Sequence, residues 1–219
     1  MAIWVKICGT TNEDDALLAV AMGADAVGFI FAPSPRQVAP QIAADIVKRL
    51  PPEIVTVGVF RDELPQRVVE ICHAAGLRAA QLHGVESPND SAWVKQRVPF
   101  VIKAFPAGSA SVGRAREYQA SAIMLDAPNP GSGEVIDWAL AQEVPVGQRL
   151  IVAGGLDAGN VAGAIARTLP FGVDVVSGVE ASPGHKDPVK LREFVAVARE
   201  AAPEEYVPDR AGPYDWMED

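Results

Sequence analysis

Short apolar runs rich in β-branched residues alternate with longer amphipathic stretches along this chain of 219 residues. The runs have the length and composition of buried strands, and the stretches between them have the apolar spacing of helices. Strands are predicted at 3–8, 25–31, 54–60, 78–82, 99–105, 121–126, 149–153 and 172–177. Helices are predicted at 12–22, 40–49, 64–75, 88–97, 111–118, 136–143, 157–168 and 187–201. This strict alternation indicates parallel strands joined by right-handed crossovers.

Alternation alone fits either a doubly wound open sheet or a closed barrel. So many strand–helix units in so short a chain favour the barrel, and the predicted fold is α/β, a single (β/α)8 TIM barrel. Gly23, Gly76 and Gly172 lie between a helix and the next strand, where glycine helix caps are expected. We therefore expect a catalytic barrel over residues 1–201 and an acidic, proline-rich C-terminal tail over 202–219. This tail is either disordered or docked on the barrel through its aromatic residues.

The last two predicted strands end in small residues, within the segments 151–155 and 173–180. Glycine lets backbone amides approach a ligand closely, and a helix starting just after Ser177 would add its positive N-terminal end. The loops after strands 7 and 8 of a barrel commonly form a phosphate site. The sequence thus predicts a barrel that binds a phosphorylated metabolite there.

Composition narrows the class of protein further. The net charge of −9 argues against a general nucleic-acid-binding protein, which needs a basic face. Cys8 and Cys72 are the only cysteines and lack metal-type spacing, which indicates a reducing compartment without disulfides. No apolar leader opens the sequence, and turn residues at 23–25 interrupt the apolar stretch at 16–33. We expect a cytoplasmic protein with a small-molecule partner and no nucleic-acid, membrane or obligate protein partner.

Candidate chemistry lies where the predicted strands end, because barrel active sites collect at the carboxyl ends of the strands. In the strand at 3–8, Lys6 and Cys8 share the face opposite the apolar Val5 and Ile7, and so point into the barrel. A buried lysine needs a partner or an anionic ligand. Cys8 is either a small buried apolar residue or a functional thiol. If it is functional, the nearby lysine is expected to favour its thiolate.

Polar residues also end two strands on the other side of the predicted barrel. Gln81 and His83 share a face and line the mouth, unless they only satisfy one another or the loops. Asp126 is a lone carboxylate after an apolar run, and is either catalytic or the cap of its own turn. Arg36 could bind a carboxylate or phosphate as a fork, although a lone loop arginine is usually solvated.

A cysteine and an aspartate across one mouth suit a base and an acid acting on one substrate. Nothing in the sequence resembles a zinc motif, a phosphate-binding Walker loop or a nucleophile elbow. From the residues alone, the prediction is a metal-free isomerase or lyase of a phosphorylated sugar derivative.

A series of short motifs, in order and at barrel spacing, resembles the phosphoribosylanthranilate isomerase family of tryptophan biosynthesis from Val5 to about Ala201. These landmarks are Lys6-Ile7-Cys8-Gly9, Gly23-Ala24-Asp25-Ala26-Val27-Gly28-Phe29, Ser34-Pro35-Arg36, Val57-Gly58-Val59-Phe60, Gln81-Leu82-His83-Gly84, Leu125-Asp126-Ala127, Ala153-Gly154-Gly155-Leu156 and Ser177-Gly178-Val179-Glu180. The family's loop after the sixth strand usually carries Gly-Gly-Thr-Gly and then Phe-Asp-Trp. This chain has Pro130-Gly131-Ser132-Gly133 and Ile136-Asp137-Trp138, and its tail exceeds the usual family length.

The resemblance implies an Amadori rearrangement of N-(5-phosphoribosyl)anthranilate to 1-(2-carboxyphenylamino)-1-deoxyribulose 5-phosphate. It implies that Asp126 is the general acid, that Cys8 is the general base and that Arg36 holds the anthranilate carboxylate. Lys6, Gln81 and His83 are expected to contact substrate. No cofactor is implied, because an iminium intermediate serves as the electron sink. The residues matching the phosphate loops are Gly154, Gly155, Ser177 and Gly178.

Two other functions stay open from the sequence. The histidine-pathway aminoaldose isomerase performs the same rearrangement on a larger substrate with two phosphates. It resembles a duplicated half-barrel with an aspartate where Cys8 stands, and a second phosphate site follows its third strand. Here that strand ends in Phe60-Arg61-Asp62-Glu63, without a glycine pair. The second alternative is a non-catalytic phosphosugar-binding barrel.

Overall fold

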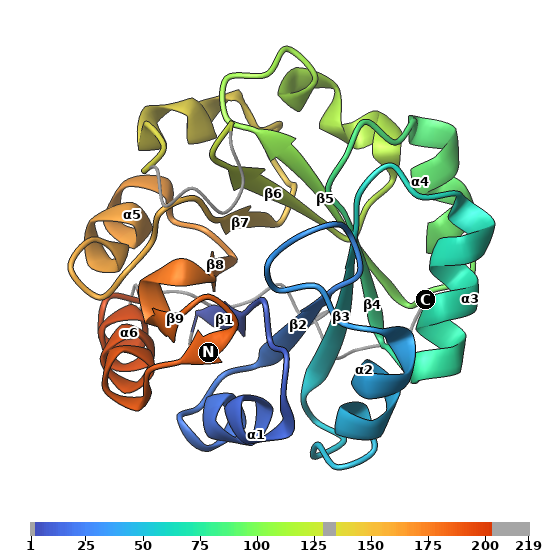
Figure 1. The fold of residues 1–219 in the computed structure, drawn as a ribbon. Coiled ribbons are helices and arrows are strands. Elements are labelled where there is room, and N and C mark those ends of the chain that lie inside the picture. Colours follow the sequence, from blue (N-terminus) through green and yellow to red (C-terminus); the bar gives the residue numbers. More distant parts are fainter. Residues whose placement is uncertain (1–2, 129–134, 203–219) are drawn as a thin grey trace.

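A closed ring of eight parallel strands forms the centre of the molecule in a computed structural model that describes residues 3–128 and 135–202. Figure 1 looks along the barrel, with the helices arranged around the strands. The predicted barrel is therefore confirmed, and the doubly wound sheet is excluded. The strands are β1 (Trp4–Ile7), β2 (Ala26–Ile30), β3 (Val55–Phe60), β4 (Ala79–Leu82), β5 (Phe100–Pro106), β6 (Ala122–Asp126), β7 (Leu150–Val152) and β8 (Gly172–Val175).

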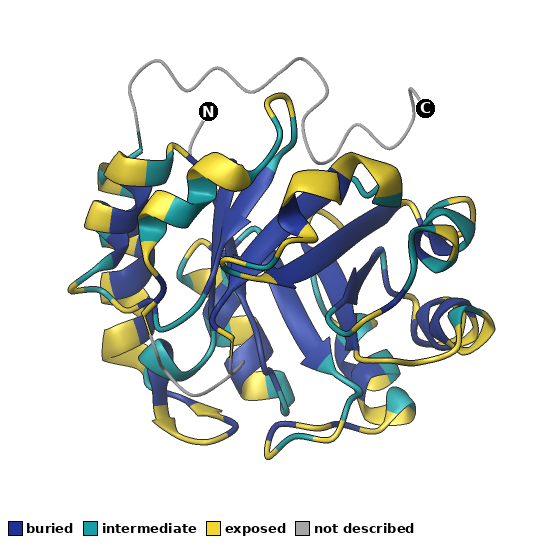
Figure 2. Cartoon of the chain, turned by 90° about the horizontal axis from the view of Figure 1, so that it is seen from above, coloured by how far each residue is buried: buried dark blue, intermediate teal, exposed yellow. Residues whose placement is uncertain are grey.

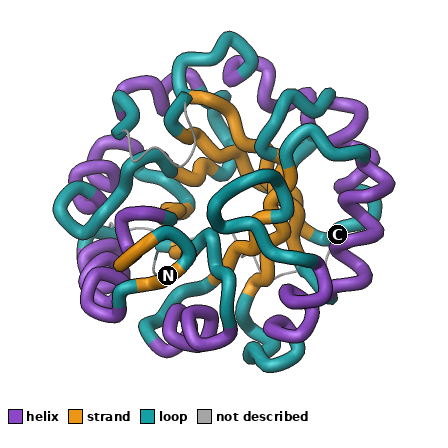
Figure 3. The backbone as a smooth tube through the Cα atoms, viewed as in Figure 1, coloured by secondary structure: helices purple, strands orange, loops and turns teal. Residues whose placement is uncertain are grey.

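All eight predicted helical segments are helical, but two of them are short 3-10 helices, η1 and η2, rather than α-helices. Short helices of this kind serve as connectors, where few residues are available for regular α-helical bonding. Figure 3 shows the helices outside the strands. The elements are α1 (Glu13–Ala21), α2 (Pro40–Val47), α3 (Pro65–Ala75), α4 (Pro88–Lys95), η1 (Val112–Tyr118), η2 (Trp138–Glu143), α5 (Val161–Thr168) and α6 (Pro188–Glu200).

Local sequence signals explain where several helices begin and end. Proline opens α2, α3, α4 and α6, where its missing N–H has no intrahelical partner in any case. Ser87 and Asp90 form a capping box at the start of α4. Gly76 ends α3 with a φ of 67°, a left-handed conformation that glycine adopts without strain.

The alternation of side chains along each strand separates two apolar cores. Val5 and Ile7 pack in the outer core between strands and helices, whereas Trp4 lies in the inner core that fills the barrel. Lys6 and Cys8 have the parity of Trp4, so the predicted orientation of this strand is confirmed. Figure 2 shows buried strands and exposed outer helix faces. The inner core also contains Ala26, Val55, Val57, Ala79, Phe100, Ile102, Ala104, Ala122, Met124, Ile151, Ala153 and Phe171.

The segment after β8 differs from the prediction. The helix expected just after Ser177 is only the three-residue 3-10 helix η3 (Ser177–Val179). A small antiparallel hairpin of β9 (Glu180–Ser182) and β10 (His185–Lys186) follows it before α6 begins. Extended backbone at Glu180 ends the helix, since this residue has φ −105° and ψ 145°. The barrel thus carries an additional hairpin beside the carboxyl end of β8.

Some expectations fall on parts of the chain outside the described residues. These are the tail from 203 onward and the loop motif Pro130-Gly131-Ser132-Gly133. Ile136 and Trp138 of the same loop are described, and Ile136 is buried in the outer core. None of the helices in residues 3–128 and 135–202 has both the length and the apolar character needed to cross a bilayer.

Candidate active site

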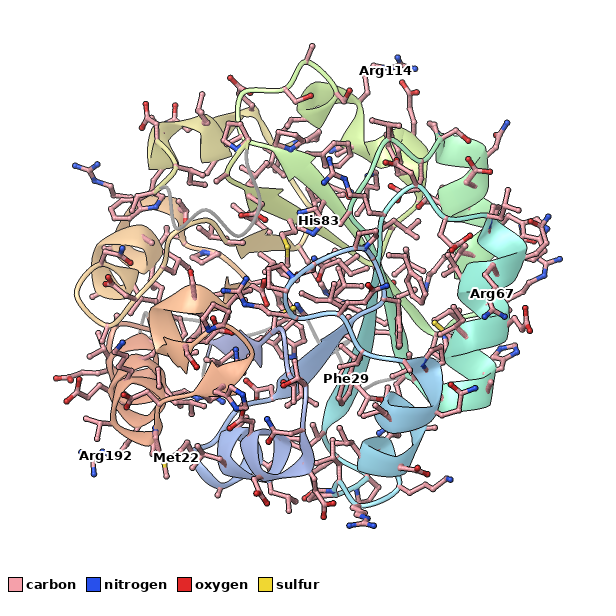
Figure 4. All side chains as sticks on the ribbon, viewed as in Figure 1. Met22, Phe29, Arg67, His83, Arg114 and Arg192 are labelled. Atoms are coloured by element: carbon pink, nitrogen blue, oxygen red, sulfur yellow. The ribbon has the colours of Figure 1, made fainter. Side chains whose placement is uncertain are left out.

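Most of the residues singled out from the sequence gather at the carboxyl ends of the strands. Lys6 is on β1 and Cys8 follows it, Gln81 is on β4 and His83 follows it, and Asp126 is the last residue of β6. In Figure 4, His83 lies within the ring of strands, whereas Arg114 and Arg192 extend from the periphery. The mouth of the barrel therefore carries a thiol, an imidazole and a carboxylate.

Gln81, His83 and Asp126 lie in a row at the mouth of the barrel. Nε2 of Gln81 lies 2.8 Å from Nδ1 of His83, and Nε2 of His83 lies 3.1 Å from Oδ2 of Asp126. With the Gln81 amide donating to Nδ1, the imidazole proton is on Nε2, the nitrogen that faces the carboxylate. The alternative that Gln81 and His83 satisfy one another is thus partly correct, but the imidazole also holds Asp126.

Asp126 also caps its own turn, which is the alternative to a catalytic role that the sequence left open. Its Oδ1 accepts a hydrogen bond of 2.7 Å from the backbone N–H of Ala127. Gly154 of the β7 loop lies against the same carboxylate, because a Cβ on this glycine would meet Asp126 Oδ1 at 3.3 Å and Ala127 N at 2.8 Å. Capping and a role in chemistry do not compete here, since the cap fixes one oxygen and His83 binds the other.

A buried ion pair anchors the loop that carries His83. Nζ of Lys103 donates to Glu86 Oε2 at 2.9 Å and to the carbonyl oxygen of Gly84 at 2.8 Å. Glu86 in turn accepts from the N–H of Gly84. Burial lowers the pKa of Lys103, although Glu86 opposes this effect. The turn after β4 is therefore tied to β5, which restrains the position of the imidazole.

The partner that buried Lys6 requires is Asp174 on β8. Nζ of Lys6 lies 2.7 Å from Asp174 Oδ1, and both side chains are buried. The two residues are register partners where β1 closes the barrel against β8. Burial alone would lower the pKa of Lys6, but the charges of Asp174 and Cys8 outweigh it and raise the pKa. Lys6 therefore stays an ammonium at neutral pH.

The thiol of Cys8 is not in the state expected from the sequence. Burial raises its pKa, and the charge of Asp174 acts in the same direction. Lys6 and Lys186 oppose this but do not overcome it. Lys6 does favour the thiolate, as expected from the sequence, but burial and Asp174 together outweigh it, so Cys8 is a thiol in the ligand-free protein.

Gly28 on β2 provides the space that Cys8 and Lys6 occupy. A Cβ at this position would lie 2.6 Å from Cys8 Sγ and 3.1 Å from Lys6 Nζ. We expect Gly28→Ala to displace the thiol and to lower kcat by about 10²-fold, the effect of a misplacement of roughly 1 Å. Steady-state turnover measures this. Gly113→Ala is the matched control, because a Cβ there meets nothing within 4 Å. Equal kcat in Gly28→Ala and the wild type would show that Cys8 needs no such space.

Arg36 is not solvated but buried, and its partner is a carboxylate of the protein. The guanidinium forms a bidentate pair with Glu180, with Nε to Oε1 at 2.8 Å and Nη2 to Oε2 at 2.6 Å. Lys186 also reaches Glu180. The sequence placed Arg36 at the mouth but did not foresee that the hairpin after β8 covers one side of it.

The two glycine loops predicted to bind phosphate lie against one another. Gly154 and Gly155 have φ of 83° and 60°. A Cβ on Gly178 would come within 2.0 Å of the carbonyl oxygen of Leu156, so only glycine fits. A cavity of about 30 Å³ lies between these loops, β6 and β8, lined by Asp126, Ala127, Ala153, Gly154, Gly155, Leu156, Asp174, Val175, Val176 and Ser177. These loops therefore border both carboxylates of the site.

Several residues of the site were missed from the sequence. Asp174 has the clearest signal, since it is a lone charge inside the apolar run Val173-Asp174-Val175-Val176. No sequence signal indicated Glu180 or Lys186, because their contacts depend on the geometry of the hairpin. Within residues 3–128 and 135–202, no three His, Cys, Asp or Glu side chains form a group that could hold a metal ion.

The fold and this site define an enzyme of the (β/α)8-barrel class, with a thiol, carboxylates and glycine loops at the carboxyl ends of its strands. Residues 5–197 match the family model described as N-(5'phosphoribosyl)anthranilate (PRA) isomerase. The chain belongs to this family, as the resemblance of its sequence motifs indicated.

Individual relatives cover nearly the whole barrel. N-(5'-phosphoribosyl)anthranilate isomerase from Desulforudis audaxviator is 49% identical over 204 residues, which are 90% of this chain and 98% of the relative. The crystal structure of phosphoribosyl anthranilate isomerase from Thermus thermophilus has a TM-score of 0.84 and 43% identity, covering 89% of this chain and 98% of that one. Another solved structure of this enzyme holds reduced 1-(o-carboxyphenylamino)-1-deoxyribulose 5-phosphate. It has a TM-score of 0.80 and 39% identity, and covers 90% of this chain and 99% of that one.

Proposed function

We propose that this chain converts N-(5'-phosphoribosyl)anthranilate into 1-(2-carboxyphenylamino)-1-deoxyribulose 5-phosphate, with Asp126 as general acid and Cys8 as general base. One observation carries the proposal. Cys8 lies beside Lys6, Lys6 is paired with Asp174, and Asp174 shares a cavity with Asp126. The candidate base is thus connected through Lys6 and Asp174 to the cavity that the candidate acid and the glycine loops line.

The acid step begins at Asp126. Its carboxyl group gives a proton to the ribose ring oxygen, the ring C–O bond breaks, and the nitrogen lone pair forms an iminium with C1. The carboxylate left behind accepts a hydrogen bond from the N–H of Ala127 and lies beside Nε2 of His83.

The base step follows at Cys8. The Cys8 thiol first releases its proton to water, and the thiolate then removes the proton from C2, so that the C2–H electron pair moves toward the iminium to give an enolamine. Tautomerisation then gives the ketone. Burial disfavours the thiolate before the reaction. The cationic iminium next to Cys8 favours it, so a larger fraction of Cys8 is thiolate when the intermediate forms. No cofactor enters these steps, because the iminium accepts the electron pair.

The remaining candidate residues hold the substrate. Arg36 binds the anthranilate carboxylate, and the backbone amides of Gly154, Gly155, Ser177 and Gly178 bind the phosphate. Lys6, Gln81 and His83 line the same mouth and orient the catalytic pair. The ligand is therefore a small phosphorylated molecule. We also propose a reducing, cytoplasmic setting, because both cysteines are free.

We expect the purified chain to consume phosphoribosylanthranilate, measured as loss of the fluorescence of the substrate. Substrate incubated without protein serves as the blank for spontaneous decay. Product formation, followed by chromatography, should match the fluorescence loss. A folded wild-type protein with no turnover above this blank would reject the proposed function in favour of a non-catalytic barrel.

A further inference from the structure

Arg36 is held along one edge of its guanidinium. Nε donates to Glu180 Oε1 at 2.8 Å and to Oε2 at 3.0 Å, and Nη2 donates to Oε2 at 2.6 Å. Both side chains are buried. Their hydrogen bonds and charges raise the pKa of Arg36 and lower that of Glu180, although burial opposes the change at Glu180. The pair is therefore ionised at neutral pH.

A guanidinium has a second edge that can also bind a carboxylate. Arginine carries five N–H donors in a planar fork. Glu180 uses the edge formed by Nε and Nη2, which leaves the end formed by Nη1 and Nη2. In the described part of the chain, no hydrogen bond from Nη1 of Arg36 is found. This end has the spacing of a planar carboxylate, so Arg36 can bind Glu180 and a ligand at once.

The hairpin that carries Glu180 is itself fixed to the catalytic strand. Lys186 on β10 donates from Nζ to Glu180 Oε1 at 3.2 Å and to the carbonyl oxygen of Cys8 at 2.7 Å. Its backbone N–H donates to Asp15 Oδ2 at 3.0 Å, and Gly184 N–H donates to Glu180 Oε1. Lys186 thus links the carboxylate of Glu180 to the backbone that follows β1.

The stem of Arg36 is restrained by the loop after β1. Gly9, with φ of 70°, lies directly against it, since a Cβ there would meet Arg36 Cδ at 2.8 Å and Val176 Cγ1 at 3.0 Å. The stem is therefore packed against the backbone of this loop. Glu180 and Lys186 then fix the orientation of the guanidinium group.

We infer that Glu180, supported by Lys186, is the positioning residue that turns the open end of Arg36 toward the carboxylate of the substrate. This inference rests on the proposed function, because it assumes that Arg36 binds the anthranilate carboxylate. Holding the guanidinium in place before binding removes the loss of side-chain freedom that the ligand would otherwise impose. Selection for an ortho-carboxylated aromatic ring thus depends on a residue that never touches the ring.

The test compares two ligands that differ only in the carboxylate. One is reduced 1-(o-carboxyphenylamino)-1-deoxyribulose 5-phosphate, and the other is the same reduced compound with an unsubstituted phenylamino group. Titration calorimetry gives Kd for wild type, Glu180→Gln, Arg36→Met and the double variant. Glu117→Gln is the matched control, because Glu117 forms an exposed bidentate pair with Arg114 on η1, from whose Nε it accepts at 2.9 Å.

The expected pattern is specific to the carboxylate. Glu180→Gln weakens the carboxylated ligand about 10- to 100-fold, the range for a hydrogen bond to a charged group, and leaves the other ligand unchanged. Glu180→Asp keeps the charge and gives a smaller loss. The Arg36→Met variant no longer distinguishes the ligands, and adding Glu180→Gln to it changes nothing further. Glu117→Gln binds both ligands as the wild type does.

Two outcomes would overturn the inference. Equal weakening of both ligands in a folded Glu180→Gln protein would indicate a purely structural role. Unchanged binding of both would show that Arg36 needs no positioning. If Glu180→Gln does not fold, Glu180→Asp decides between the same two outcomes. A wild type that does not prefer the carboxylated ligand would instead reject the proposed role of Arg36, and turnover of phosphoribosylanthranilate would show whether the rest of the proposed function stands.

Discussion

Asp126→Asn is expected to lower kcat by about 10²–10⁴-fold, the usual contribution of a general acid or base. Asparagine has nearly the same shape, and its amide oxygen can still accept from the Ala127 N–H that Asp126 binds at 2.7 Å. The turn is therefore preserved while the proton donor is lost. Steady-state turnover, together with binding of the reduced product analogue, separates these two effects.

A control distinguishes loss of the acid from loss of any capping carboxylate. Asp90 also accepts backbone hydrogen bonds, in the capping box of α4, and lies outside the site. We expect Asp90→Asn to keep its kcat. Turnover near the wild-type level in Asp126→Asn would show that Asp126 serves only as the cap of its turn.

Cys8→Ser is expected to be nearly inactive, with a loss of kcat of similar size. A hydroxyl is far less acidic than a thiol, so serine is a poor base at neutral pH. Cys72→Ser is the matched control, since Cys72 is buried in α3 among apolar side chains and away from the barrel mouth. The comparison requires kcat for both variants and a circular dichroism spectrum of each. A Cys8→Ser enzyme as fast as Cys72→Ser would overturn the assignment of the base.

The state of the two thiols also predicts how alkylation depends on pH. Burial raises the pKa of Cys72 to about 12, and burial with Asp174 raises that of Cys8 above its ordinary 9.0. Below a thiol's pKa, the thiolate fraction grows about tenfold per pH unit, and the thiolate is the reactive species. Alkylation of ligand-free Cys8 by iodoacetamide should thus be slow at pH 7 and accelerate up to and beyond pH 9. A plateau already at pH 7, measured by mass spectrometry, would contradict a raised pKa.

The fold could be predicted because its signals are local and repeated. Alternating apolar periods and a glycine cap such as Gly76 each specify one element, and the number of such elements in so short a chain favours a barrel over the open sheet. The inward face of Lys6 and Cys8 followed from the parity of a single strand. The 3-10 conformation of η1 and η2 was harder to predict, because the apolar spacing of a six- or seven-residue segment does not distinguish a 3-10 helix from an α-helix.

The site was predicted less completely, and the reason is again physical. Cys8 and Asp126 could be found because strand ends in a barrel converge on one mouth. Whether Cys8 is a thiol or a thiolate depends on its burial in the folded barrel and on Asp174, which lies on another strand and acts against Lys6. The hairpin carrying Glu180 depends on a backbone conformation that the sequence pattern did not reveal. The alternation along a strand predicts which way a side chain points. The charges around that side chain depend on residues that are distant in the sequence.

The seam between β1 and β8 has a consequence for how the protein is made. Lys6 meets its partner Asp174 across 168 positions of sequence, and Lys186 reaches the Cys8 carbonyl across 178. A ribosome therefore delivers Cys8 and Lys6 long before Asp174 and Lys186, which place charges around them. A nascent chain with only seven strands would leave the Lys6 ammonium without its carboxylate, a costly state inside an apolar core. The site is therefore complete only after the last strand has been synthesised and has closed the barrel.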